Sequence, residues 1–278
     1  MPGGKTRLPG NVSSQFISGL LLASPLAARN VEISVTSPLE SKPYVRMTLD
    51  VIKKHGIVSE VSKNLRDYRI PAVQQYRRHN HQVPGDFSSA AFPIVAAAIT
   101  RSEVTIGNLV TQEEQPDQLL LGILQDMGVA ISATDKSVTI SPSLMRGKEI
   151  DVRDCPDLVP VLAVAGSFAE GRTLIKGAGR LRIKESDRLS SITSELSKMG
   201  AKIAEGKDSL TVEGPSELKG TEVDSHGDHR IVMACAVAAL GAHGVTKINN
   251  PECIKKSYPS FMFDMKRLGA DMRWVEIP

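Results

Sequence analysis

Residues 157–178 read DLVPVLAVAGSFAEGRTLIKGA: small apolar residues, then a polar turn with glycine, then a β-branched run. This order predicts a helix followed by a strand. The same order recurs at residues 13–35, 88–109 and 229–250. Ala, Gly, Ser and Val occupy nearly every face of these helices, which leaves no polar stripe for solvent. We therefore expect the four helices to be buried.

An amphipathic helix that stops at a glycine follows each of these stretches. Glycine readily adopts the left-handed conformation that commonly ends a helix. The stop glycines are spaced by 72, 72 and 69 residues along the chain: Gly56, Gly128, Gly200 and Gly269. Short alternating or β-branched runs come next and predict strands, most clearly at residues 129–133, 201–205 and 270–277.

Together these elements form a repeating unit. A further extended stretch precedes the small-residue helices, most clearly KEIDVRD at residues 148–154 and GTEVDSH at 220–226. Each unit then has the order β-α-β-α-β-β over roughly 70 residues, and such internal periodicity indicates a repeat architecture. Strands separated by helices predict an α/β protein, and buried helices covered by sheets predict an inside-out arrangement.

A domain boundary is expected in RIPAVQQYRRHNHQVPGD, residues 69–86. This stretch is polar, contains two prolines and loses the periodicity of the segments on either side. The sequence therefore predicts a partial domain of about one repeat unit at residues 1–84 and a near-complete three-repeat domain at residues 85–278.

The composition argues against several functional classes. A formal net charge of +3 and 4% aromatic residues are too low for a typical nucleic-acid-binding surface, although a small positive excess suits a small anionic ligand. No apolar run is long enough to predict a membrane span. The cysteines lack CxxC spacing, which argues against a disulfide framework or a metal site and for a reducing, cytoplasmic compartment: Cys155, Cys235 and Cys253.

Polar residues that break the apolar pattern gather where helices begin. Ser13, Ser14 and Gln15 open the first small-residue helix, where free N–H groups and two hydroxyls suit a phosphate group. Ser41 and Tyr44 start another helix and add a hydroxyl and a phenol. The simpler explanation is that these residues only cap or begin their helices.

The third unit carries a dense charged motif. Asp157 opens its small-residue helix, either as a cap or as a carboxylate that accepts hydrogen bonds from a substrate or removes a proton. In RIKESDR, residues 182–188, a helix is expected from about Glu185, which puts Lys184, Glu185 and Arg188 near one face. The motif is then either a solvated ion-pair network or an anion clamp around a titratable glutamate.

The fourth unit adds two further charged motifs. Asp228, His229 and Arg230 begin its small-residue helix, and burial of a His-Arg pair for structure alone is costly. Lys255 and Lys256 occupy the place that RIKESDR holds in its own unit, as solvated lysines or as part of a site. Because these positions are equivalent in the repeat, we expect one pocket for a pair of anionic, polyhydroxylated ligands.

Six motifs, in this order and spacing, resemble the 5-enolpyruvylshikimate-3-phosphate synthase (3-phosphoshikimate 1-carboxyvinyltransferase) family over essentially the whole chain. They are GNVSSQF at residues 10–16, ESKPY at 40–44, GDFSSAAF at 85–92, RIKESDR at 182–188, GDHRIVMA at 227–234 and KSYPSF at 256–261. The resemblance implies the enolpyruvate transferase-like fold, an inside-out α/β barrel, with four of the family's six βαβαββ units present. It also implies transfer of the enolpyruvyl group from phosphoenolpyruvate to the 5-hydroxyl of shikimate 3-phosphate, without metal or organic cofactor.

Matched motif by motif, the resemblance also implies roles for residues. Shikimate 3-phosphate would be bound by Ser13, Ser14, Gln15, Ser41, Tyr44, Asp157 and Lys184. Phosphoenolpyruvate would be bound by Gln15, Glu185, Arg188, His229, Arg230 and Lys256. Asp157 would be the base for the 5-hydroxyl, and Glu185 would donate a proton to the methylene carbon.

The chain departs from the family pattern in two ways. The family often has Asn before RIKESDR, whereas this chain reads GAGRLR at residues 177–182, with Arg180 or Arg182 as the anion contact. The N-terminal third of the family, with further phosphoenolpyruvate contacts, has no counterpart here. We therefore expect a fragment, a truncated reading frame or one partner of a split enzyme. Unpaired sheet edges and apolar helix surface would favour a complementing N-terminal fragment or self-association.

Two further functions stay open. One is the related transferase that acts on UDP-N-acetylglucosamine, although its N-terminal loop cysteine has no counterpart here and SSQ, RIKESDR and DHR favour shikimate 3-phosphate. The second is a non-catalytic half-enzyme that binds shikimate 3-phosphate weakly.

Overall fold

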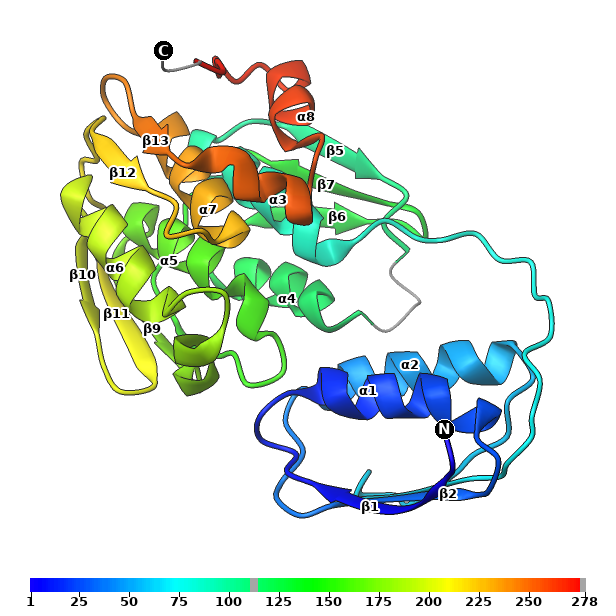
Figure 1. The fold of residues 1–278 in the computed structure, drawn as a ribbon. Helices are drawn as coiled ribbons and strands as arrows, with labels where there is room; N and C mark the ends of the chain where they lie inside the picture. Colours follow the sequence, from blue (N-terminus) through cyan, green and yellow to red (C-terminus); the bar gives the residue numbers. More distant parts are fainter. Residues whose placement is uncertain (111–114, 276–278) are drawn as a thin grey trace. The chain divides into compact units, whose positions relative to one another are not determined.

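The computed structural model describes residues 1–110 and 115–275, which divide into two compact units. One is built mainly from Met1–Val83 and the other from the chain that begins at Pro84. Figure 1 draws both, coloured along the sequence. Each unit is described by itself below.

The first unit is one complete β-α-β-α-β-β repeat. Its elements are β1 (Gly4–Leu8), α1 (Ser14–Ala23), β2 (Val31–Val35), α2 (Lys42–Lys54), β3 (Glu60–Val61) and β4 (Asp67–Ile70). The sheet has the order β1-β2-β4-β3, with β1 parallel to β2 and the other pairs antiparallel. Helices α1 and α2 pack together beside this sheet (Figure 1).

The prediction that every small-residue helix is buried is wrong for α1. Only Ser14, Ile17 and Leu21 of this helix are buried, whereas Phe16 is 57% exposed and Leu22 is 47% exposed. Within the first unit α1 packs against a single long helix, so one of its faces has no cover. The composition of α1 is typical of a helix with neighbours on every side, and the first unit supplies fewer.

The second unit contains the remaining helices and strands. Its strands are β5 (Val104–Gly107), β6 (Ala130–Ala133), β7 (Ser137–Ser141), β8 (Glu149–Asp151), β9 (Gly171–Lys176), β10 (Lys202–Glu205), β11 (Ser209–Gly214), β12 (Glu222–Asp224) and β13 (Lys247–Asn249). Its α-helices are α3 (Phe87–Thr100), α4 (Leu119–Asp126), α5 (Val159–Phe168), α6 (Arg188–Lys198), α7 (His229–Leu240) and α8 (Phe261–Arg267). Short 3₁₀ turns include η2 (Pro116–Gln118), η3 (Pro156–Leu158), η4 (Gly179–Ile183) and η5 (Pro251–Lys256).

Helices α3, α5 and α7 form the centre of the second unit and confirm the inside-out arrangement. Most residues of each are buried, and the three pack against one another. The strands lie around them in separate sheets of order β5-β7-β6, β10-β11-β9-β8 and β12-β13 (Figure 1). Because the central helices carry small side chains, they pack closely together. The loops that lead into their N-termini are neighbours.

The prediction of an amphipathic helix that stops at a glycine is confirmed in all four repeat units. Helices α2, α4, α6 and α8 end two residues before glycines with φ between +81° and +99°: Gly56, Gly128, Gly200 and Gly269. The strand predicted at residues 270–277 is not found at 270–275, and the rest lies outside the described residues. A strand needs a hydrogen-bonded neighbour, and none of the described strands pairs with residues 270–275. Within the described ranges no helix is long and apolar enough to cross a membrane.

Candidate functional site

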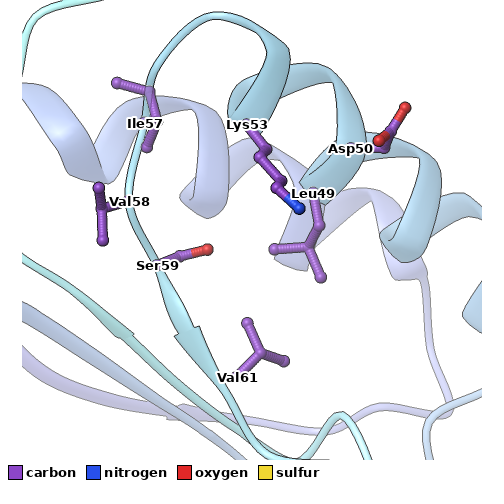
Figure 2. Close-up of a pocket in the computed structure, with 7 residues that line it drawn as sticks. All are labelled: Leu49, Asp50, Lys53, Ile57, Val58, Ser59 and Val61. Atoms are coloured by element: carbon purple, nitrogen blue, oxygen red, sulfur yellow. The ribbon is translucent and has the colours of Figure 1, made fainter.

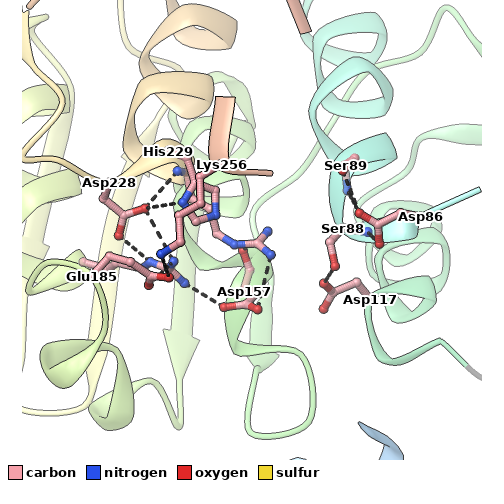
Figure 3. A network of polar contacts seen from close by, with 11 residues as sticks. Asp86, Ser88, Ser89, Asp117, Asp157, Glu185, Asp228, His229 and Lys256 are labelled. Atoms are coloured by element: carbon pink, nitrogen blue, oxygen red, sulfur yellow. Dashed lines mark hydrogen bonds and ion pairs between the residues drawn. The ribbon is translucent and has the colours of Figure 1, made fainter. Parts of the chain in front are cut away.

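One group of charged residues in the second unit lies where two helices begin. Helix α6 starts at Arg188 with Asp187 as its N-cap, and α7 starts at His229 with Asp228 as its N-cap. Asp157 comes from η3 and Lys256 from η5, and Figure 3 shows their side chains converging. We call the following six residues the Arg188 cluster: Asp157, Glu185, Arg188, Asp228, Arg230 and Lys256.

Arg188 is the centre of this cluster. Its side chain is 2% exposed, and its guanidinium donates to three carboxylates. Nη1 lies 2.7 Å from Asp157 Oδ1, Nη2 lies 2.8 Å from Glu185 Oε2, and Nε lies 2.7 Å from Asp228 Oδ2. A buried guanidinium with three charged acceptors is stable only where the geometry is good. Arg188 therefore holds three separate segments of chain together.

Arg230 and Lys256 bring two further cations to the same carboxylates. Arg230 Nη2 lies 3.3 Å from Asp157 Oδ2. Lys256 Nζ lies 3.0 Å from Glu185 Oε1 (Figure 3). The Arg230 Nε atom is buried and has no hydrogen-bond partner among the described residues. The Lys256 side chain is 61% exposed. The exposed Lys256 thus keeps donors that an added anion can reach, and Arg230 keeps one unsatisfied donor that is buried.

His229 lies beside the cluster, but its ring makes a weaker contact. Its Nδ1 atom lies 3.8 Å from Asp228 Oδ1, and the side chain is 6% exposed. Burial lowers the pKa of His229, and Arg230 and Arg188 lower it further, against the raising effect of Asp228 and Glu185. The imidazole is therefore neutral near pH 7 and available as a hydrogen-bonding group.

The two candidate proton-transfer groups are both ionised in this structure. Burial raises the pKa of Asp157, but Arg230, Arg188 and Lys184 outweigh it and bring that pKa down to about 2. Burial also raises the pKa of Glu185, yet the hydrogen bond from Lys256 and the charge of Arg188 lower it to about 2. Near neutral pH both carboxylates are therefore unprotonated, and each must lose a cationic neighbour before it holds a proton.

The expectation that a helix begins near Glu185 is wrong. Residues up to Ile183 form η4, Lys184 is extended, and α6 begins only at Arg188 because the Asp187 carboxylate caps the Ser190 N–H at 3.1 Å. Lys184 and Glu185 therefore approach the cluster from a loop rather than from a helix face. Lys184 is half-buried and forms no hydrogen bond or ion pair with any residue the structure describes, but its charge still acts on Asp157.

The replacement anion contact expected from Arg180 or Arg182 is not in the Arg188 cluster. Arg182 Nη1 lies 2.9 Å from Asp187 Oδ2 and 3.0 Å from Glu205 Oε2. Arg180 donates to the Arg153 carbonyl at 2.7 Å. Both arginines are therefore engaged in contacts that support the loop before α6.

The remaining predicted residues lie in the first unit. Ser13 is the N-cap of α1, with its hydroxyl accepting from the Gln15 N–H at 3.2 Å, and Ser14 is buried. Ser41 is the N-cap of α2 with φ of +51°, and Tyr44 lies in its first turn. The loops that enter these helices are joined, since the Glu40 N–H donates to the Gly10 carbonyl at 3.1 Å.

Both helix starts of the first unit therefore lie at one end of that unit. Each helix follows one of the parallel strands β1 and β2, so their first turns lie beyond the same strand ends. Ser13 also performs the capping role that its position in the sequence allows. The hydroxyls and helix dipoles at this end are suited to a phosphate group.

Two acidic residues near the site do not stand out in the sequence as site residues. Asp228 is fully buried, and Asp117 in η2 is 1% exposed and accepts a hydrogen bond from the Ser88 hydroxyl (Figure 3). Burial, opposed by Arg230, raises the pKa of Asp117 to about 6. The sequence marks Asp228 only as part of a helix start. It offers no signal for Asp117, because the partners of this carboxylate come from other helices.

One groove of the first unit lies away from these residues. A groove of about 440 Å³ lies between α2 and β3, lined mostly by apolar side chains and by Lys53, Asp50 and Ser59 (Figure 2). It contains none of the predicted site residues. Among the described residues, no three His, Cys, Asp or Glu side chains are grouped so that they can hold a metal ion.

Acid should weaken the second unit through the Arg188 cluster. The pKa values of Asp157 and Glu185 are depressed to about 2 from ordinary values of 3.8 and 4.5, so their stabilising effect is complete above about pH 4.5 and is lost toward pH 2. Replacement Asp157→Asn should flatten this fall, measured as urea midpoint against pH. Asp208→Asn, at an exposed carboxylate, is the control. An unchanged slope in Asp157→Asn contradicts the prediction.

Comparison with known proteins gives one consistent result. A model of the family EPSP synthase (3-phosphoshikimate 1-carboxyvinyltransferase) matches residues 1–265. A 3-phosphoshikimate 1-carboxyvinyltransferase from Methanocorpusculum labreanum is 43% identical over 271 residues, covering 98% of this chain and 64% of that protein. Another from Clostridium acetobutylicum is 44% identical over 272 residues, covering 98% of this chain and 63% of that protein.

Solved structures agree with the sequence relatives. An EPSP synthase from Acinetobacter baumannii superposes with a TM-score of 0.80 at 28% identity, covering 96% of this chain and 62% of that chain. A second structure of EPSP synthase from this organism has a TM-score of 0.81 at 26% identity, covering 99% and 64%. The chain thus spans about 64% of the length of the curated relatives it matches.

Proposed function

The chain belongs to the EPSP synthase family, and on that premise we propose that it transfers the enolpyruvyl group of phosphoenolpyruvate to the 5-hydroxyl of shikimate 3-phosphate. The oxygen of this hydroxyl bonds to C2 of phosphoenolpyruvate as its proton leaves, and C3 gains a proton. Loss of a proton from C3 then expels phosphate from C2. The observation that carries the proposal is the Arg188 cluster, in which three cations and three carboxylates meet at two helix starts.

The contacts of the cluster favour different roles for its three cations. Arg188 already satisfies three carboxylates, so its main effect is to hold them in place. Arg230 and Lys256 keep unused donors and would bind the carboxylate and phosphate of phosphoenolpyruvate, with neutral His229 beside them. Preorganised cations of this kind stabilise developing charge without reorganisation.

The same contacts provide a reason for Glu185 to carry a proton only when substrate is present. In the ligand-free protein Lys256 and Arg188 keep the pKa of Glu185 at about 2. An anion that draws Lys256 away removes the first of these contacts and raises that pKa. Glu185 would then deliver a proton to C3, while Asp157 removes the proton of the 5-hydroxyl.

For shikimate 3-phosphate we propose the residue roles that membership of the family implies. Ser13, Ser14 and Ser41 would hold its phosphate with the N–H groups of their helix starts, and Tyr44 would line that position. Gln15 would contact both substrates, and Lys184 would contact the hydroxyls of shikimate 3-phosphate together with Asp157. The three free cysteines suit a reducing compartment, and we place the protein in the cytoplasm.

Phosphate release measures this proposal directly. The chain is incubated with phosphoenolpyruvate and shikimate 3-phosphate, alone and with the N-terminal part of a curated relative, because the chain spans about 64% of such a relative. We expect release that requires both substrates, in at least one of the two arms. Activity of the chain alone would exclude the non-catalytic half-enzyme. Absence of release in both arms contradicts the proposed function.

The same assay tests the sugar-nucleotide substrate and the need for a partner. Substitution of UDP-N-acetylglucosamine for shikimate 3-phosphate should abolish release. Exposed Phe16 and Leu22 on α1, and the open sheet edge at β3, are surfaces on which a complementing fragment or a second copy would pack. Activity per chain that rises with chain concentration would support self-association, and activity that needs the added part would support complementation.

A further inference from the structure

A second buried charge cluster lies on the same face of α6 as Arg188. Glu195 is seven residues after Arg188, which places the two side chains two turns apart on one side of the helix. The Glu195 side chain is 0% exposed. A buried carboxylate is costly for the fold unless several donors satisfy it, so its partners indicate what it does.

Two of those partners belong to the loop Asp224–Asp228, which leads from β12 into α7. The Asp224 N–H donates to Glu195 Oε2 at 3.0 Å, and His226 Nε2 lies 2.7 Å from Glu195 Oε1. Since an ionised carboxylate only accepts, the Nε2 atom carries the proton in this contact. Burial raises the pKa of Glu195, but hydrogen bonds from Lys198, His226 and Asp224 outweigh it and lower that pKa.

The loop between these contacts is tightly constrained. His226 has φ of +52°, a left-handed conformation that a residue with a side chain adopts at a cost. Ser225 is fully buried, its hydroxyl accepts from the Gly227 N–H at 3.1 Å, and its carbonyl accepts from the Asp228 N–H at 2.9 Å. The loop thus has one defined path into the start of α7.

Helix α6 therefore holds this loop at both ends. Glu195 binds Asp224 and His226 near its beginning, and Arg188 binds Asp228 at its end. Asp228 in turn accepts from the Arg230 N–H at 2.9 Å. A loosened Glu195 contact would let the loop shift, and Asp228 and Arg230 would shift with it.

We propose that Glu195 and His226 are positioning residues for the anion site, because they fix the Asp224–Asp228 loop on α6 and so set the place of Asp228 and Arg230. The inference deepens the proposed function and rests on it only for the identity of the anion. The attachment of the loop is a property of the protein itself and is measured without substrate.

Lys198 offers a matched control. Its Nζ lies 2.9 Å and 2.8 Å from the two oxygens of Glu195, but it belongs to α6 and makes no described hydrogen bond to the loop. Removal of Lys198 weakens the same carboxylate cluster without releasing the loop. Removal of the His226 ring releases the loop, while both Ala and Gln at this position keep the Cβ atom.

The test is an NMR comparison of the full chain with His226→Ala, His226→Gln and Lys198→Met. We expect His226→Ala to shift or broaden the Arg188 Nε–H signal and to speed exchange of the Arg230 amide about tenfold through local opening. His226→Gln, whose amide donates to Glu195 over a similar reach, should restore both signals. Lys198→Met should leave both unchanged.

Two outcomes overturn the inference: unchanged signals in His226→Ala, or equal changes in Lys198→Met and His226→Ala. A parallel titration with phosphoenolpyruvate separates this from the proposed function. If Arg230→Ala binds as tightly as the unaltered chain, the proposed anion site is wrong. If Arg230→Ala weakens binding but His226→Ala does not, the site stands and the positioning role fails.

Discussion

Replacement Arg188→Ala is expected to lower the free energy of unfolding of the second unit by about 3–5 kcal/mol, the usual cost of removing one partner from a buried ion pair. Three carboxylates lose their shared cation, and Asp228 stays fully buried with its charge. Urea denaturation followed by circular dichroism measures the loss. Arg188→Lys should recover only a small part, because one ammonium group cannot bridge three carboxylates.

Arg153→Ala is the matched control for this loss. Arg153 also pairs with a carboxylate, Asp151, at 2.6 Å, but its side chain is 70% exposed. Exposed pairs contribute at most about 1 kcal/mol, so this variant should differ little from the unaltered chain. Equal losses in Arg153→Ala and Arg188→Ala would contradict the prediction, because burial of the Arg188 cluster would then add nothing to the free energy of unfolding.

Replacement Glu185→Gln is expected to reduce phosphate release by roughly 10²–10⁴-fold, the range typical of a lost general acid or base. Glutamine keeps the size of Glu185 and an oxygen that accepts from Arg188, but it cannot give and retake a proton. Binding of phosphoenolpyruvate should change much less, because Arg230 and Lys256 stay in place. The measurement is release of phosphate in the active arm of the assay, with binding followed by titration.

Glu213→Gln is the control for turnover. Glu213 on β11 pairs with Arg172 on β9 at 3.8 Å, and this exposed ion pair lies outside the Arg188 cluster and the loop before α6. This variant should turn over at the normal rate. Unchanged turnover in Glu185→Gln would remove the proton-transfer role, and a parallel loss of binding would assign Glu185 to substrate binding instead.

Much of the fold is readable from local patterns. The glycine stops at Gly56, Gly128 and Gly200 depend on one backbone conformation, and the small-residue helices indicate burial through composition alone. Each signal lies within a short window of sequence. The errors come from context, as in α1, where composition predicts burial but the unit supplies too few neighbours to cover Phe16.

The candidate site is readable only in part. DHR at residues 228–230 and RIKESDR at 182–188 mark the right region, because charged residues at the start of a buried apolar helix are costly without partners. The sequence does not show that Arg188 joins these motifs to one another. Its guanidinium contacts Asp157 and Asp228, which lie in segments far apart in the chain. The start of α6 is predicted too early because helical spacing does not show that Asp187 caps the helix.

The most direct test of the central claim is an NMR titration of the full chain with phosphoenolpyruvate that follows the guanidinium signals. Arg230 Nε is a buried donor without a partner among the residues described, so a bound anion should change its signal strongly. The account predicts saturable changes at Arg230, with smaller ones at Arg188 and none at exposed Arg153. Unchanged Arg230 signals at millimolar phosphoenolpyruvate, or equal changes at Arg153, would contradict the claim that this cluster is the anion site.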